Sequence, residues 1–337
     1  MEIKKSSISE LWSAPHIHHI KDYGLRNKAD LQLDSGSFGL VSNRVLLDVE
    51  QCPALSDPLL IFLNLLREDP PPILRASLRI RVAPNGMQGL WLDAANTVIA
   101  ELLKERDWLN RWTPKIKIEM GQKRKSPTWM NDRWKLRRSE LLPWWQTPLT
   151  DGQNAVLYTF IGSFTQPSFD ANAVLVHTLM ELTESIEAAT WVEYGAGCGN
   201  LTLPMASSGR YIVASELDRA AREGLERSAE EYNLSAHIET TPLNLERNTE
   251  ESRALVRRAD ALLVDPPRGG LRGFLAHIES VRPPHLVYVA CGTEALLSDA
   301  KELRAWGYDI VDLKGVNQFP LTPHTEWIVH FKHSSIH

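Results

Sequence analysis

Three segments in the second half of the chain carry residue types that can do chemistry at the edge of a sheet. The apolar run 286–290 is followed by Cys291, and the run Ala261–Val264 is followed by Asp265. A Gly-rich turn at residues 193–200 precedes both. Because parallel α/β sheets bind ligands at the carboxyl ends of their strands, these groups are predicted to converge on one ligand. Their order indicates methyl transfer through a covalent cysteine adduct; the alternative is three unrelated loops.

The Gly-rich turn favours a particular methyl donor. Gly195, Gly197 and Gly199 allow a sharp turn and close approach of the backbone to a ligand at the start of a helix. Such turns occur in many nucleotide-binding proteins. Glu216 follows the next predicted strand, where a carboxylate can accept both hydroxyls of a ribose. The turn lacks the continuation typical of NAD or ATP sites, so S-adenosylmethionine is the predicted ligand.

The Asp265 corner reads Asp265-Pro266-Pro267-Arg268. Two prolines could simply make a rigid loop. Methyltransferases that act on exocyclic amino groups usually have an aromatic residue after the prolines, to stack the base. Arg268 stands there in this chain, which argues for other chemistry.

The C-terminal half alternates strands with helices, which predicts a doubly wound, Rossmann-like parallel sheet with helices on both faces. The predicted strands are 190–194, 211–215, 237–240, 261–264 and 286–290. The predicted helices include 172–188, 201–207 and 219–233.

The N-terminal half has a different pattern. Short alternating runs at 29–33 and 77–82 suit half-buried strands, and helical patterns cover 56–68 and 95–107. Together they predict a smaller α+β domain with a largely antiparallel sheet. The expected division is an RNA-binding domain at 1–150 and a methyltransferase domain at 151–337.

Residues 115–138 hold nine lysines and arginines against two acids. Four tryptophans interleave with or follow them: Trp129, Trp134, Trp144 and Trp145. Cations that meet phosphates, beside rings that stack bases, are typical of proteins that bind single-stranded or loop RNA. The alternative is a solvated basic loop whose tryptophans pack between the domains.

Composition excludes several classes of protein. With a formal net charge of −5 over 337 residues, nucleic-acid binding must come from a local basic patch. Cys52, Cys198 and Cys291 are too few and scattered for a disulfide framework or a cysteine metal site, which favours a reducing compartment. The first seven residues have no signal-peptide core, and the longest apolar stretch, 59–66, is too short to span a bilayer. A cytoplasmic protein is predicted.

Six motifs, in order, resemble the RNA uracil-5-methyltransferase family, whose members make 5-methyluridine in tRNA and rRNA. They are Phe164-Thr165-Gln166-Pro167 with Asn172, Gly197-Cys198-Gly199-Asn200, Ser215-Glu216, the stretch from Asp265 to Leu271, Tyr288-Val289-Ala290-Cys291, and the stretch from Gln318 to Glu326. The resemblance covers roughly residues 160–331 and extends loosely into the N-terminal half.

The resemblance implies roles for individual residues. Cys291 would be the nucleophile, Glu326 the base, and Asp265 a further residue of the catalytic site. The residues that would bind S-adenosylmethionine or shape its site are Gln166, Gly195, Gly197, Asn200, Glu216, Asn244 and Asp265. No metal is expected. Only Cys52 matches a ligand of the family's optional iron–sulfur cluster, so no cluster is expected either. RNA is the implied partner, and no membrane is expected to be involved. The protein is expected to be a monomer.

The chemistry of uracil agrees with this pair of residues. Carbon 5 is a poor nucleophile, so a thiolate must first add at carbon 6 to generate an enolate. Carbon 5 then attacks the methyl sulfonium, and a carboxylate must remove the carbon-5 proton before the cysteine can leave. A uridine in folded RNA would be extruded from its stack to reach the thiol.

The chain also departs from the family pattern. The family commonly reads Ser-Cys-Asn-Pro where this chain has Ala290-Cys291-Gly292-Thr293. No segment resembles the family's optional N-terminal RNA-binding barrel, so that barrel is not expected. Buried cysteine is more often a small hydrophobic residue than a nucleophile. Two alternatives therefore stay open: an RNA 5-methylcytosine methyltransferase, and a non-catalytic RNA-binding paralogue.

Overall fold

The computed structural model describes residues 8–121, 123–320, 322 and 324–334. The chain forms two compact units. The C-terminal unit comprises Met1–Lys21, Gln146–Leu157 and Asp170–His337, and the N-terminal unit comprises Asp22–Trp145 and Tyr158–Phe169. The single boundary predicted at residue 150 differs from this division, because the chain passes between the units at four points. Two of these points lie within β10 (Leu142–Pro148) and β11 (Asn154–Thr159), which form a separate two-stranded sheet.

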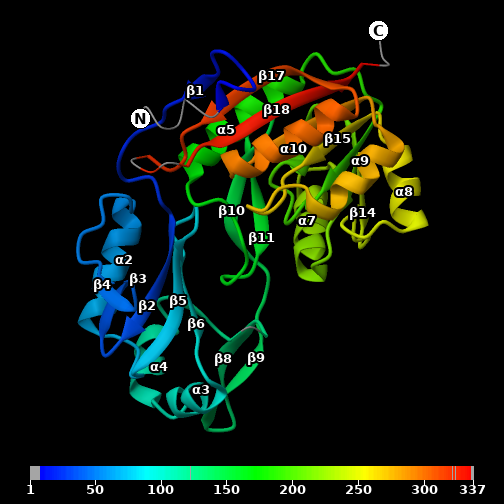
Figure 1. Ribbon diagram of the computed structural model, residues 1–337. Helices are drawn as coiled ribbons and strands as arrows, with labels where there is room; N and C mark the ends of the chain where they lie inside the picture. Colours follow the sequence, from blue (N-terminus) through cyan, green and yellow to red (C-terminus); the bar gives the residue numbers. More distant parts are fainter. Residues whose placement is uncertain (1–7, 122, 321, 323, 335–337) are drawn as a thin grey trace. The chain divides into compact units, whose positions relative to one another are not determined.

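The C-terminal unit is built on an eight-stranded sheet of order β1-β17-β18-β16-β15-β12-β13-β14 (Figure 1). The strands are β1 (His16–His18), β12 (Thr190–Tyr194), β13 (Tyr211–Ser215), β14 (Ile238–Thr241), β15 (Ala261–Val264), β16 (His285–Ala290), β17 (Tyr308–Val316) and β18 (Glu326–His333). The helices are α5 (Phe169–Thr183), α6 (Thr202–Ser207), α7 (Arg219–Glu231), α8 (Glu250–Arg257), α9 (Leu275–Val281) and α10 (Thr293–Ala305), with 3-10 turns at Ser235–His237 and Arg272–Phe274. The predicted α/β class with a doubly wound sheet is confirmed.

One strand runs against the others. Strands β12 to β16 pair in parallel, but β18 pairs antiparallel with both β16 and β17. The five predicted strands are thus parallel as expected, and β18 is an additional strand of opposite direction beside them. The predicted helix 172–188 is displaced, since α5 begins at Phe169 and ends at Thr183.

Burial explains why the central strands form. All four residues of β15 are buried, as are Leu286 to Ala290 of β16. Strands covered on both faces read as continuous apolar runs, which is how the sequence marks them. They contribute to one core cluster together with residues of α8, α9 and α10.

The N-terminal unit has its own eight-stranded sheet, of order β4-β3-β2-β5-β6-β7-β8-β9. The strands are β2 (Lys28–Asp34), β3 (Ser37–Ser42), β4 (Val45–Asp48), β5 (Arg75–Val82), β6 (Gln88–Asp93), β7 (Lys117–Met120), β8 (Lys125–Met130) and β9 (Arg133–Arg138). Apart from the parallel pair β6–β7, neighbouring strands are antiparallel, as predicted.

Three helices share a core with this sheet: α2 (Asp57–Glu68), α3 (Asn96–Leu102) and α4 (Arg106–Trp112). The alternation in β2 and β5 is that of half-buried strands, with Leu31, Leu33 and Leu78 in the core. The single helix predicted over 95–107 is wrong. It is interrupted before α4, where Glu105 leaves the helical region with a ψ of 71°.

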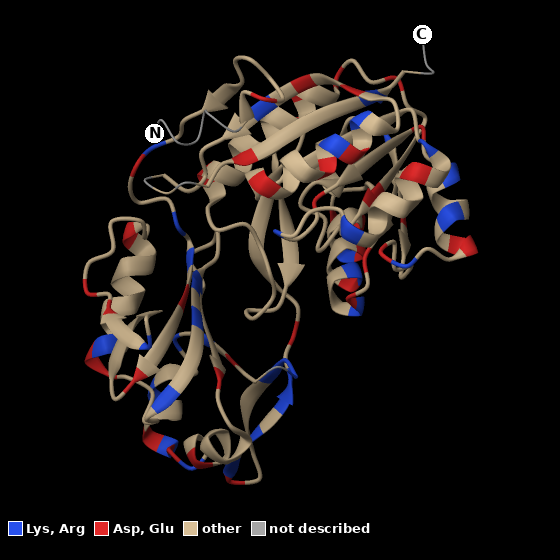
Figure 2. Cartoon of the chain, in the orientation of Figure 1, with Lys and Arg blue, Asp and Glu red and all other residues tan. Residues whose placement is uncertain are grey.

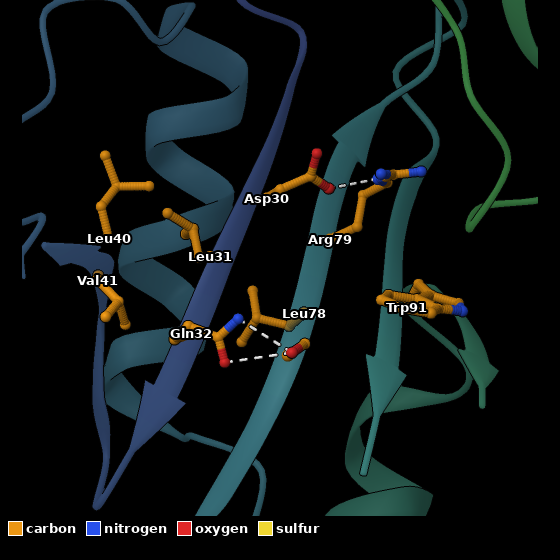
Figure 3. A pocket seen from close by; sticks show the side chains of 10 residues that line it. Asp30, Leu31, Gln32, Leu40, Val41, Leu78, Arg79 and Trp91 are labelled. Atoms are coloured by element: carbon orange, nitrogen blue, oxygen red, sulfur yellow. Dashed lines mark hydrogen bonds and ion pairs between the residues drawn. The ribbon is translucent and has the colours of Figure 1, made fainter. Parts of the chain in front are cut away.

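The other face of β2, β3, β5 and β6 carries a hollow of about 390 Å³ (Figure 3). Its polar side chains pair with each other: Arg79 with Asp30, and Gln32 with Ser77. These polar groups are satisfied within the unit.

Within the part of the chain that the structure describes, no helix is long and apolar enough to cross a bilayer.

Candidate active site

The sheet of the C-terminal unit has a switch point beside β12. From β12 the chain continues outward to β13 and β14, then returns to β15 on the other side. Ligands of doubly wound folds bind at the carboxyl ends of strands beside such a point. The loops at this edge carry most of the predicted site residues: Gly195, Gly197 and Asn200 after β12, Glu216 after β13, Asn244 after β14, Asp265 after β15 and Cys291 after β16.

The Gly-rich loop is held in a conformation that favours glycine. Gly195 and Gly197 have φ values of 77° and 56°. The N–H groups of Gly195 and Ala196 donate to the Ser215 carbonyl, at 2.9 and 3.1 Å. A Cβ at Gly197 would meet no atom within 4 Å, whereas one at Gly199 would lie 2.4 Å from Leu225 Cδ1. Gly197 therefore leaves an open surface, and Gly199 allows close packing against α7.

Glu216 ties this loop to the start of α7. The Gly197 N–H donates to Oε2 at 2.9 Å, and the Asp218 N–H donates to Oε1 at 2.7 Å. Each carboxylate oxygen keeps a second acceptor position for a ligand. The side chain is thus oriented by the backbone.

Asn200 is fixed by a reciprocal amide pair. Asn172 Nδ2 donates to Asn200 Oδ1 at 2.9 Å, and Asn200 Nδ2 donates to Asn172 Oδ1 at 2.8 Å. The Asn200 carbonyl accepts from Thr147 Oγ1 at 2.7 Å. Asn244 accepts from the Glu246 N–H at 2.9 Å and so shapes its own turn. Gln166 is buried and belongs to the N-terminal unit.

The antiparallel strand β18 brings Glu326 to Cys291. Ala290 pairs with Trp327 in the β16–β18 register, so the next residues, Cys291 and Glu326, face each other where the pairing ends. Glu326 is 2% exposed, and Gln318 Nε2 donates to its Oε2 at 2.9 Å. Two residues of this final motif, Leu321 and Pro323, lie outside the described residues.

Burial and neighbouring charges shift the pKa values of Glu326 and Cys291, and burial shifts that of Asp265. Burial raises the pKa of Glu326, and the Asp265 carboxylate adds to the effect. Burial also raises the pKa of Asp265. The pKa of Cys291 is raised to about 11 by burial and then by the charges of Glu326 and Asp265, while Arg268 acts in the opposite direction. The thiol is therefore mostly protonated near neutral pH.

Glu193 was not predicted as a site residue. It lies in β12, is 2% exposed and accepts from Thr202 Oγ1 at 2.6 Å. Burial raises its pKa to about 8, with the charges of Asp265 and Glu216 contributing. The available signal was an acid within an otherwise buried, largely apolar strand.

Asp299 was also missed. It accepts from the Tyr288 hydroxyl and from the Leu271 N–H, both at 2.9 Å. A Cβ at Gly270 would lie 2.4 Å from Asp299 Oδ2. Asp299 thus anchors the loop that follows Asp265, and an acid on the buried side of a predicted helix was the signal for it.

The residues that depart from the family pattern have local partners. A Cβ at Gly292 would lie 3.0 Å from the Arg268 carbonyl oxygen, so the two loops approach closely there. Thr293 Oγ1 accepts from the indole N–H of Trp327 at 2.9 Å, next to Glu326. These two residues therefore fix the loop around Cys291 in this chain.

Thr293→Val should destabilise the protein by about 1–3 kcal/mol, because it leaves the N–H of the fully buried Trp327 without an acceptor. Thr293→Ser keeps the hydroxyl and should unfold close to the wild type. Urea unfolding of the three proteins tests this. Equal midpoints for the Val and Ser variants would contradict the assigned role of the hydroxyl.

The basic segment of the N-terminal unit forms β7, β8 and β9. Trp144 and Trp145 are 1% and 2% exposed, and Trp134 packs against the core. The interpretation of Trp144 and Trp145 as base-stacking rings is therefore wrong, while Trp134 is half-buried and its stacking role stays a prediction. Trp129 remains, at 44% exposed.

The fold and the site together define a doubly wound methyltransferase with a cysteine and a carboxylate at its ligand edge. Residues 146–334 match the family model described as tRNA (Uracil-5-)-methyltransferase. The chain belongs to this family.

Known proteins resemble the chain to different extents. It is 34% identical to an uncharacterized RNA methyltransferase of Bdellovibrio bacteriovorus, over 90% of this chain and 80% of that one. It is 37% identical to the 23S rRNA (uracil(1939)-C(5))-methyltransferase of Dechloromonas aromatica, over 50% of this chain and 39% of that one. The crystal structure of Pyrococcus abyssi tRNA (uracil-54, C5)-methyltransferase with S-adenosyl-L-homocysteine superposes with a TM-score of 0.71, at 19% identity, over 98% of this chain and 82% of that one. That likeness shows the shared fold.

Proposed function

We propose that this protein transfers a methyl group from S-adenosylmethionine to carbon 5 of a uridine in tRNA or rRNA. Cys291 forms the covalent bond to carbon 6, and Glu326 removes the carbon-5 proton. The observation that carries the proposal is the β16–β18 register, which sets the buried Glu326 opposite Cys291. One thiol and one separate carboxylate are the groups that this reaction needs.

The charges at the strand ends suit the methyl donor. Asp265 and Glu216 both act electrostatically on Glu193. In the described part of the chain, no cationic side chain forms an ion pair with any of the three carboxylates. S-adenosylmethionine supplies a transferable methyl group on a positively charged sulfonium. A cationic ligand relieves the repulsion among the carboxylates, and Gly197 leaves its loop open for it.

The protein's own residues then carry the proton and the covalent bond. Cys291 loses its proton to solvent, and its sulfur bonds to carbon 6. The electrons of the 5,6 double bond form a 4,5 double bond, and those of the carbon-4 carbonyl move to oxygen 4, which gives the enolate. After carbon 5 has taken the methyl group, Glu326 accepts the carbon-5 proton. The double bond re-forms, the sulfur–carbon bond breaks, and the thiolate is regenerated. Glu326 later releases its proton to solvent.

Raised pKa values predict how the covalent step depends on pH. Because burial and the charge of Glu326 raise the pKa of Cys291 to about 11, trapping on RNA containing 5-fluorouridine should accelerate by up to about tenfold per pH unit from pH 6 to 9. Glu326→Gln removes one negative charge beside the thiol, which lowers the thiol pKa. The rate profile of that variant should therefore move to lower pH. Denaturing gels of reactions quenched at successive times measure the rate of trapping at each pH. A profile that moved to higher pH in the variant would contradict the assigned effect of the Glu326 charge on the thiol pKa.

Nucleoside analysis of RNA treated with the protein and labelled methyl donor tests the function itself. The expected product is 5-methyluridine. A product of 5-methylcytidine would support the cytosine alternative, and no product from any RNA would support a non-catalytic RNA-binding protein. Sequencing of RNA trapped on Cys291 then identifies the target uridine.

A further inference from the structure

Strands β8 and β9 form a hairpin at the end of the sheet of the N-terminal unit. They pair over six residue pairs, from Lys125 with Arg138 to Met130 with Arg133. Asn131 and Asp132 connect them with φ values of 51° and 57°, as in a type I′ turn, which matches the twist of a hairpin. Among the residues that the structure describes, one pair, Met120–Lys125, links β8 to β7, so the hairpin extends beyond the edge of β7.

The hairpin has one apolar face and one basic face, because residues that pair directly point to the same side. The apolar face holds Pro127, Trp129, Trp134 and Leu136, with the pair Lys125–Arg138 at its base, and Trp134 and Leu136 pack against the core of the unit. The other face therefore points away from that core. It carries Ser126, Thr128, Met130, Arg133, Lys135 and Arg137.

The cations of the basic face are available to a ligand. Arg133 and Arg137 are exposed and Lys135 is half-buried. In the described part of the chain, no carboxylate pairs with any of the three, and Arg137 Nε donates to Met130 Sδ at 3.1 Å. Lysine and arginine are visible along this hairpin in Figure 2.

The neighbouring basic run is used differently. The Arg124 guanidinium lies over the Phe160 ring, 5.0 Å from its centroid. Burial raises the pKa of Glu119, and the charge of Arg124 acts in the opposite direction. Arg124 is thus engaged within its own unit. Arg133, Lys135 and Arg137 are the three cations that share one face of the hairpin.

We propose that this basic face binds the phosphates of one strand of the substrate RNA; the inference rests on the proposed function, in which RNA is the substrate. Successive cations on β9 stand about 6.6–6.8 Å apart, a spacing comparable with that of consecutive phosphates in a nucleic-acid strand. The hydroxyls of Ser126 and Thr128 lie beside them as further donors. The aromatic rings are on the opposite face, so contact is with the backbone, which positions RNA without reading its sequence.

The triple variant Arg133→Gln/Lys135→Gln/Arg137→Gln tests the inference in the full-length protein, with a fluorescent tRNA transcript as the probe. Affinity should fall about tenfold to a hundredfold at low salt, and the slope of log K against log salt should fall by about 0.7–0.9 per lost phosphate contact. The loss should be equal for RNAs of different sequence. A matched control, Arg44→Gln/Arg75→Gln/Lys104→Gln, removes the same charge from exposed positions elsewhere on the unit.

The possible outcomes distinguish failure of the hairpin inference from failure of the proposed function. An unchanged salt slope in the hairpin variant, or an equal loss in the control, would overturn the inference while the wild type still methylates uridine. A loss confined to RNAs of one sequence would also overturn it, because it would indicate base contacts. If the wild type neither binds nor methylates RNA, the proposed function itself fails.

Discussion

Cys291→Ala should lose at least about 10⁴-fold in methyl transfer to RNA, because removal of a covalent nucleophile leaves only binding and orientation. The variant should still bind S-adenosylmethionine. The Gly-rich loop and Glu216 are held by backbone hydrogen bonds that do not involve the thiol. Methyl incorporation and titration calorimetry measure the two effects separately.

A matched control is Cys52→Ala, which removes a thiol from the N-terminal unit. It should retain turnover. Cys291→Ser is a second useful variant, since a hydroxyl keeps the size of the side chain but lacks a reactive thiolate. Full activity in Cys291→Ala would end the covalent mechanism, and loss of donor binding in that variant would mean that the substitution had disturbed the donor site.

The central strands of the C-terminal unit could be predicted because their signal is local. The predicted bounds of β12, β13 and β15 agree with the structure residue for residue, since each is a short, mostly buried run with a polar or glycine residue after it. The positions of Asp265 and Cys291 at strand ends follow from the same pattern. The predicted helix ends were less accurate, as at α5. Contacts with other elements set where a helix ends, and the periodicity of the sequence does not show those contacts.

The proximity of Glu326 to Cys291 could not be derived from such runs. It depends on β18 pairing antiparallel with β16 in a register that leaves the two residues facing each other. Register is a relation between segments far apart in sequence, and only the family resemblance pointed to Glu326. The same limit applies to Asp299, whose partners Tyr288 and Leu271 come from other elements.

The composition of the basic segment gave a partly wrong prediction, because composition does not show which side chains are buried. Four tryptophans near a basic run indicated a stacking surface, yet Trp144 and Trp145 lie on β10 and are almost fully buried. Strand alternation was the stronger signal in the same segment. Applied to β8 and β9, it assigns Arg133, Lys135 and Arg137 to the face opposite the rings, while Lys125 and Arg138 share the face of the rings.

Glu326→Gln should stall the reaction after methyl transfer. If Glu326 removes the carbon-5 proton, the variant should still bond Cys291 to carbon 6 and methylate carbon 5. It could not eliminate the sulfur, because elimination requires that proton to leave. Glutamine keeps the size of the side chain and can accept the hydrogen bond that Gln318 Nε2 donates, so the fold of this edge should be preserved.

The expected species is a methylated covalent protein–RNA complex that survives denaturation and migrates as a shifted band. Wild-type protein should form the corresponding complex on RNA containing 5-fluorouridine, where fluorine occupies the position of the departing proton. Cys291→Ala should form neither, which ties both bands to one sulfur–carbon bond. Mass spectrometry of the trapped nucleotide should find one added methyl group, because the block falls after transfer. An unmethylated adduct would instead assign Glu326 to an earlier step. Normal turnover by Glu326→Gln, with no trapping by 5-fluorouridine, would exclude the carbon-5 mechanism and leave the doubly wound methyltransferase fold to serve a different acceptor.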